Sequence, residues 1–162
     1  MATRLIEFKK KNYEKLSRLL LGNESAIEFI SMAFVSFHIL DDLIDKDTAL
    51  SDEDICKAFW GMLIDLPVNP FYINNFASIR PMIINAYVNW ETANQYERDN
   101  DNLHTAFIIR SAYIDILSLC VFIVGGLDWA LECAFEIKHW AHSETFEGYL
   151  TNLEAEQKLR EV

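Results

Sequence analysis

The stretch ESAIEFISMAFVSFHILDDLID, residues 24–45, carries an apolar helical pattern that runs directly into a group of acids. Its apolar residues recur every three or four positions, which is the period of one face of an α-helix. These residues are Ile27, Ile30, Phe34, Phe37 and Leu40. The stretch therefore predicts a long helix whose buried face ends at a cluster of carboxylates.

The rest of the chain shows the same helical periodicity and few turn residues. Of 162 residues, 51% are hydrophobic and only 5 are Gly and 3 are Pro, which favours long helices over many short strands. We predict a single all-α domain, residues 1–162, built as one bundle of about seven helices. The pattern places a break near Ser78, and an unbroken apolar helix from the polar turn RDNDN to Val124, closed by Gly125-Gly126.

The charge and cysteine content limit the classes of partner. A net charge of −11 argues against nucleic acid and against an anionic membrane surface. The apolar segment 106–126 contains Arg110 and Asp115, so we expect a core helix and no membrane insertion. The 3 cysteines form no CxxC pair and the N-terminus lacks an apolar signal core, so we expect a cytoplasmic protein.

The acids at the end of the first stretch are placed to hold a cation. Asp41 and Asp45 are one helical turn apart, Asp42 points aside, and His38 lies one turn earlier. The acids repel one another and lie at a helix C-terminus, where negative charge is unfavourable. Each carboxylate can give an oxygen to Mg²⁺, which prefers hard oxygen ligands. The alternative interpretation is a solvated acidic helix end.

The sequence DDLID at residues 41–45 resembles the DDxxD motif of the class I isoprenoid (terpenoid) synthases. A second motif of that family, (N/D)DxxSxxxE, is similar to NWETANQYE, where Asn89 and Glu97 match. Ala93 stands at the Ser position and Trp90 at the Asp position of that motif. The resemblance rests on these two short motifs, and family members are usually much longer.

The resemblance implies an isoprenoid synthase-like helical fold that holds Mg²⁺ and a diphosphate-containing small molecule. Asp41 and Asp45 would be the principal metal ligands, and the other metal candidates are Asp42, Asn89, Glu97 and Asp115. Arg110 and His38 are assigned to ligand binding. The structural alternative for Arg110 and Asp115 is a pair of buried ion pairs that fix how the helices cross. Catalysis is left open.

Two further interpretations come from other classes of protein. The chain also resembles the all-α nucleotide pyrophosphohydrolases of the MazG and dimeric dUTPase group, which bind Mg²⁺ through acids spaced by one helical turn on neighbouring helices. The pairs Asp42/Asp45 and Asn94/Glu97 have a similar spacing. That resemblance implies a homodimer. The last alternative is a non-catalytic helical interaction protein of viral or mobile-element origin, in which the acidic motif is incidental.

Overall fold

A computed structural model describes residues 4–46, 48–142 and 144–160, and it contains helices but no strand in these ranges. The α-helices are α1 (Arg4–Leu19), α2 (Glu24–Asp45), α3 (Asp52–Trp60), α4 (Pro70–Asp99), α5 (Leu103–Ile109), α6 (Ile114–Ala141) and α7 (Phe146–Arg160). A π-helical turn η1 (Gly61–Asp65) and a 3-10 turn η2 (Leu66–Val68) connect α3 to α4. The prediction of an all-α fold is confirmed.

Side-chain caps fix where three of the helices begin. The side-chain oxygens of Asn23, Ser51 and Asn69 accept hydrogen bonds from backbone N–H groups in the first turns of α2, α3 and α4. These bonds satisfy donors that the helix itself leaves without a partner. Asn69 also donates its Nδ2 to the carbonyl of Ser25 at 2.9 Å, which ties the start of α4 to the start of α2.

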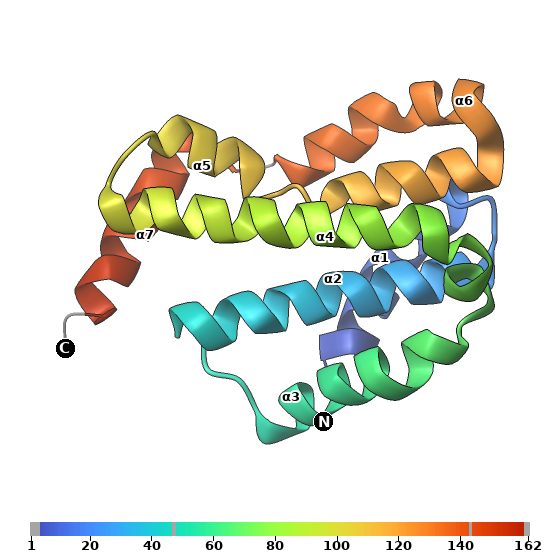
Figure 1. Cartoon of the computed structure of the whole chain (residues 1–162), viewed down its shortest axis with the longest axis horizontal. Coiled ribbons are helices and arrows are strands. Elements are labelled where there is room, and N and C mark those ends of the chain that lie inside the picture. The colour runs from blue at the N-terminus through green and yellow to red at the C-terminus, as the bar shows by residue number, and fades with distance from the viewer. Residues whose placement is uncertain (1–3, 47, 143, 161–162) are drawn as a thin grey trace.

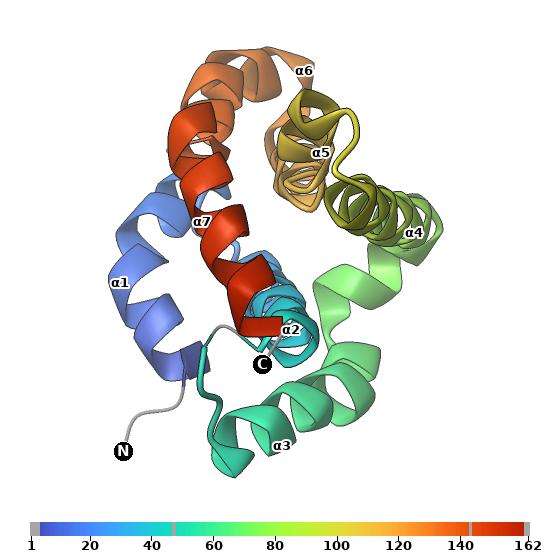
Figure 2. The same cartoon turned by 90° about the vertical axis from the view of Figure 1, so that its left-hand side faces the viewer.

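Helix α2 occupies the centre of the bundle, with α1, α3, α4 and α6 arranged around it (Figures 1 and 2). Its side chains Phe29 and Ile30 are fully buried, and Phe29 stacks on Tyr72 of α4 with ring centroids 5.6 Å apart. Burial of one such side chain contributes about 1.5–3 kcal/mol. The packing therefore fixes the N-terminal part of α2 against the start of α4.

Helix α4 continues through Pro81, whereas the sequence predicted a break near Ser78. Proline removes the hydrogen bond to the carbonyl four residues earlier, that of Ala77. Both residues lie on the exposed side of α4, where water can replace the lost bond. The distortion lies at Asn75 instead, where φ is −119° and the side chain donates to the carbonyl of Phe71 at 2.8 Å.

The predicted unbroken helix from the RDNDN turn to Val124 is wrong. A turn at residues 110–113 separates α5 from α6, so Arg110 lies at a junction between helices. Gly126, with φ 78° and ψ −175°, reverses the chain within α6 and produces the two antiparallel arms seen in Figure 1. By length and composition alone, the segment Leu103–Trp140 qualifies as one candidate membrane span.

Candidate functional site

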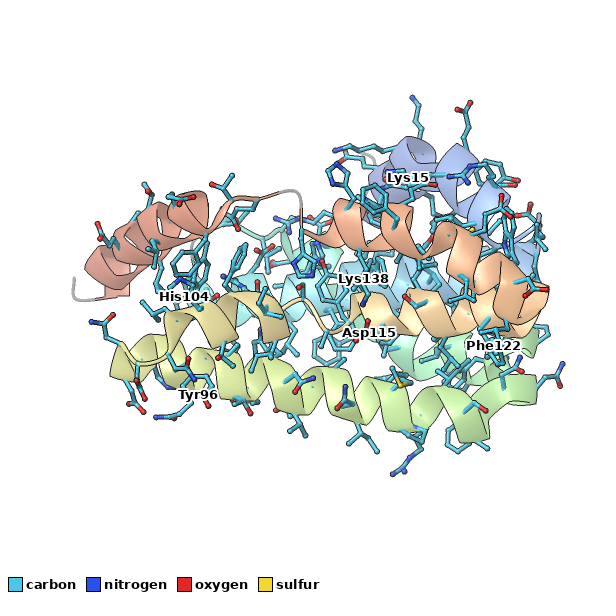
Figure 3. The ribbon with its side chains drawn as sticks, turned by 90° about the horizontal axis from the view of Figure 1, so that it is seen from above. Lys15, Tyr96, His104, Asp115, Phe122 and Lys138 are labelled. Atoms are coloured by element: carbon cyan, nitrogen blue, oxygen red, sulfur yellow. The ribbon has the colours of Figure 1, made fainter. Side chains whose placement is uncertain are left out.

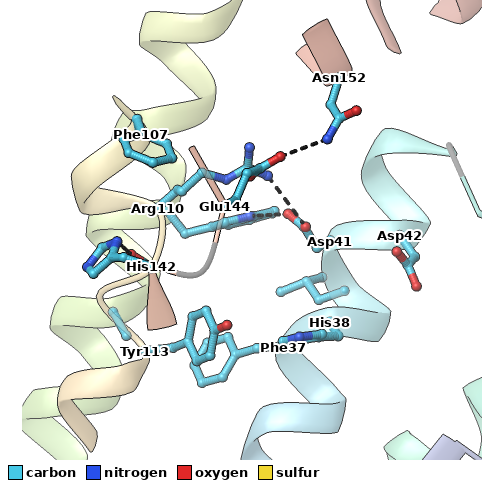
Figure 4. Close-up of a pocket in the computed structure, with 14 residues that line it drawn as sticks. Phe37, His38, Asp41, Asp42, Phe107, Arg110, Tyr113, His142, Glu144 and Asn152 are labelled. Atoms are coloured by element: carbon cyan, nitrogen blue, oxygen red, sulfur yellow. Dashed lines mark hydrogen bonds and ion pairs between the residues drawn. The ribbon is translucent and has the colours of Figure 1, made fainter. Parts of the chain in front are cut away.

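A half-open pocket of about 260 Å³ lies where the C-terminal end of α2 faces α4 and the α5–α6 junction (Figure 4). One group of lining residues is apolar or aromatic: Phe37, Leu40, Ala86, Trp90, Phe107 and Tyr113. A second group is polar or charged: His38, Asp41, Asp42, Arg110, Ser111, His142, Glu144 and Asn152. An apolar wall with a few convergent polar groups is typical of a small-molecule site.

Asp41 is the carboxylate at the centre of the polar wall. Trp90 donates its indole N–H to Oδ1 of Asp41 at 2.6 Å. The guanidinium of Arg110 lies 3.8 Å from Oδ2 of the same carboxylate. A dashed line between Arg110 and Asp41 marks this ion pair in Figure 4. About a third of the Asp41 side chain is exposed, so a ligand in the pocket can reach it.

Asp42 and Asp45 have surroundings different from that of Asp41. Asp42 also lines the pocket, but it forms an ion pair with Arg4 of α1. Asp45 is 5% exposed, contacts other groups and does not line the pocket. Within the part of the chain that the structure describes, no three His, Cys, Asp or Glu side chains are grouped to share a metal ion. The three acids of the motif therefore do not form one cluster, and Asp41 is the one that lies beside Arg110 in the pocket.

Arg110 links the pocket to a buried acid of the second motif. Its guanidinium lies 3.5 Å from Oε1 of Glu97, which is 3% exposed and accepts a hydrogen bond from the hydroxyl of Tyr149 at 2.8 Å. Arg110 also lies over the ring of Tyr149, 5.3 Å from its centroid. Glu97 is thus held inside the protein by α7 and the α5–α6 junction.

Of the other positions of the second motif, Trp90 lines the pocket, whereas Ala93 and Asn89 do not. Ala93 is fully buried in a small core cluster with Ala106, Tyr149 and Leu153. Asn89 is half-buried on α4 and does not line the pocket. Only Trp90, which replaces the motif's aspartate, contacts Asp41.

His38 lies against the aromatic wall. Its ring meets Tyr113 edge-on, with centroids 5.5 Å apart. Desolvation by its surroundings lowers the pKa of His38 below the usual 6.5, although the nearby Asp41 and Asp42 act in the opposite direction. Part of the side chain remains open to solvent. The neutral imidazole is therefore favoured in the folded protein.

Asp115 is separate from this group. It forms an ion pair with Lys138 across the two arms of α6, as Figure 3 shows, and does not line the pocket. The pair joins two helical arms, as the structural alternative expects, but its side chains are 37% and 49% exposed, so it is not a buried ion pair.

The sequence motifs did not predict the far side of the pocket. Ser111 and His142, with Oγ and Nδ1 3.4 Å apart, lie there with Glu144 and Asn152, which hydrogen-bond to each other at 2.7 Å. They come from the α5–α6 junction, the connection between α6 and α7, and α7 itself, and no spacing in the sequence connects them. Comparison with known proteins finds no matching family model, no similar curated protein and no similar solved structure. The function has to be inferred from the pocket's own chemistry.

Proposed function

We propose that the pocket binds a small diphosphate-class ligand together with Mg²⁺. Asp41 is the carboxylate that contacts the metal, and Arg110 is the cation that contacts a phosphate oxygen. The observation that supports this most directly is the convergence of the two side chains from distant segments, 3.8 Å apart in one pocket. An acid to hold a divalent ion, beside a guanidinium to hold a phosphate, is a suitable pair for this ligand class.

The charges around the pocket favour a cation as part of the ligand. Asp41 and the buried Glu97 both face the guanidinium of Arg110, and Glu144 adds a further carboxylate. Asp42 is paired with Arg4. A diphosphate alone would meet more negative than positive charge here, so a divalent ion between Asp41 and the phosphates supplies the missing positive charge.

The volume of the pocket limits what the ligand carries besides its diphosphate. At about 260 Å³ it lies just below the range of roughly 300–1,000 Å³ that is usual for drug-sized ligands. We therefore favour inorganic pyrophosphate or a diphosphate with a short apolar group against Phe37 and Tyr113. A nucleoside triphosphate would extend well beyond these walls, which makes the nucleotide pyrophosphohydrolase interpretation the weaker one.

Thermal unfolding with Mg²⁺, with and without pyrophosphate, tests the proposal on three proteins. Asp41→Asn removes the charge but keeps an oxygen that can accept from Trp90. Asp115→Asn is the matched control, since its carboxylate is similarly exposed (37% against 34%), is also ion-paired and lies outside the pocket. A ligand at 100 times its Kd stabilises the native state by about 2.7 kcal/mol, which is roughly 5–10 °C in Tm for a chain of this size.

We expect this rise for the wild type and for Asp115→Asn only when both Mg²⁺ and pyrophosphate are present, and no rise for Asp41→Asn. An equal rise in Asp41→Asn would place the ligand elsewhere. A rise with Mg²⁺ alone would indicate a structural metal, and no rise in the wild type would reject diphosphate binding and favour the interaction-protein alternative.

A further inference from the structure

The outward face of α4 carries a stripe of exposed apolar side chains. We define the α4 stripe as six residues on this face: Phe76, Arg80, Ile84, Tyr87, Val88 and Glu91. Successive members are three or four positions apart, except for the adjacent pair Tyr87 and Val88. The four apolar members are each 45–54% exposed. The opposite face of α4 carries the buried residues Ile79, Ala86 and Ala93, so the stripe does not belong to the core. Figure 2 shows α4 at the edge of the bundle.

The stripe supplies most of the apolar area that one side of a protein interface needs. About half of each of four large apolar side chains amounts to roughly 300–400 Å² of apolar surface, which is within the size range of the largest apolar patch on a typical monomer, a patch that is often functional. A stable interface buries about 800 Å² per partner, of which a little over half is apolar. Arg80, Glu91, Gln95 and Arg98 supply exposed or half-exposed polar surface along the same face.

The charges in the stripe complement one another when the stripe meets its own copy. Arg80 is exposed and forms no ion pair with any residue that the structure describes, although the chain has a net charge of −11. Glu91 accepts a hydrogen bond from Tyr87 at 3.1 Å on its own helix. When two α4 helices pack antiparallel with their midpoint between residues 85 and 86, each Arg80 lies level with a Glu91 of the other copy. Both residues are then about 8 Å along the helix from that midpoint, at 1.5 Å per residue.

We propose that the α4 stripe is a homodimer interface, in which α4 packs antiparallel against α4 of a second copy about a two-fold axis between residues 85 and 86. A two-fold axis uses the same patch on both subunits, so each contact between different residues occurs twice. Ile84 of one copy then faces Tyr87 of the other at the centre. Arg80 of each copy faces Glu91 of the other at the two ends.

Another exposed apolar stripe, the α6 stripe, is a poorer candidate for this role. The α6 stripe consists of Leu127, Leu131 and Phe135 on the second arm of α6, and these side chains are 61–82% exposed. The nearby cation Lys138 is already paired with Asp115 within the chain, and the acids around it would repel their own copies. This stripe therefore provides a matched control surface.

Sedimentation equilibrium of the wild type and of charge-reversed variants tests the dimer. We expect a mass of twice 18.8 kDa at about 100 µM, a concentration that detects micromolar dissociation constants. Arg80→Glu places an acid opposite Glu91, and Glu91→Arg places a base opposite Arg80, so each should weaken the dimer at least about tenfold. The double variant Arg80→Glu/Glu91→Arg restores opposite charges and should recover most of the affinity.

Two further variants test the surface itself. Ile84→Glu should give a monomer, because each copy would place a charge at the apolar centre of the dimer. Leu131→Ser on the α6 stripe should leave the dimer intact. Of the four positions changed, Arg80, Ile84 and Leu131 are exposed and Glu91 is partly exposed. Far-ultraviolet circular dichroism checks that each variant is folded. A wild type that stays monomeric, single reversals without effect, a double variant weaker than both singles, or dissociation by Leu131→Ser would each overturn the proposal.

Discussion

The indole N–H of Trp90 on α4 lies 2.6 Å from a carboxylate oxygen of Asp41 on α2, and this bond joins the two helices at the pocket. Trp90 occupies the position where the second isoprenoid-synthase motif has an aspartate. A donor that contacts the first acid thus stands where that family has a second acid. Any cation that binds Asp41 has to share the carboxylate with this tryptophan.

Replacement of Trp90 by Phe should lower the free energy of unfolding by about 1–2 kcal/mol, because it keeps an aromatic ring but removes a hydrogen bond to a charged group. Urea unfolding of Trp90→Phe, Asp41→Ala and the double variant measures the interaction directly. We expect a coupling energy of about 1 kcal/mol. Strictly additive single effects would show that the bond contributes nothing to stability.

His38 should make the stability of the protein fall as the pH is lowered below 6.5. Because its pKa is lowered in the folded state, the unfolded chain binds a proton first, and the free energy of unfolding decreases between 6.5 and the folded pKa. Comparison of wild type and His38→Gln by urea unfolding from pH 7.5 to about 5 should show a shallower loss in the variant. Parallel curves would contradict the assignment.

The pKa of His38 should also report the charge on Asp41. Since the Asp41 carboxylate favours the charged imidazole, Asp41→Asn should lower the pKa of His38 further. Titration of the His38 ring by nuclear magnetic resonance measures this. A pKa that rises in the variant would show that the two groups do not interact as the structure indicates.

The buried Glu97 should be far more important for stability than an exposed acid. Glu97→Gln removes the charge that faces Arg110 and should cost about 2–3 kcal/mol, because the guanidinium loses a buried partner. Glu28→Gln is the control, since Glu28 is exposed and its oxygen is 3.7 Å from Lys9, and it should cost less than about 1 kcal/mol. Similar urea midpoints for both variants would refute the prediction.

Replacement of Gly126 by a residue with a side chain should lower the stability of the protein. Its φ of 78° with ψ of −175° belongs to a region that side chains rarely adopt, and such strain costs about 1–3 kcal/mol. Gly126→Ala should therefore lower Tm by several degrees. Gly148→Ala is the matched control, because an added Cβ there meets no atom closer than 3.4 Å and φ is not positive. Equal Tm values for the two variants would contradict this account of the reversal.

The helix starts were the most predictable part of the fold. Asn23, Ser51 and Asn69 cap helices by local hydrogen bonds to backbone groups that lie three positions further along the sequence. The turn at residues 110–113 and the continuity of α4 through Pro81 were missed. Both depend on which side of a helix faces water or a neighbouring helix, which no local pattern specifies.

The site was predictable on one side only. The sequence singled out Asp41, Asp42, His38 and Arg110, and the structure brings these four to one pocket. The motif spacing could not show that Glu97 is turned into the protein against Tyr149, because that depends on where α7 packs. Metal binding at Asp41 and Asp45 stays a prediction, and the two carboxylates have different surroundings.

The position of Arg110 between Asp41 and Glu97 has a thermodynamic consequence. One guanidinium interacts with an acid that a ligand can reach and with an acid that holds α7 through Tyr149. Neutralising Asp41 would strengthen the attraction of Arg110 for Glu97, and by reciprocity a firmer contact at Glu97 would alter the affinity at Asp41. Occupancy of the pocket and attachment of the C-terminal helix are therefore linked equilibria, and hydrogen exchange in α7 would register the state of the pocket.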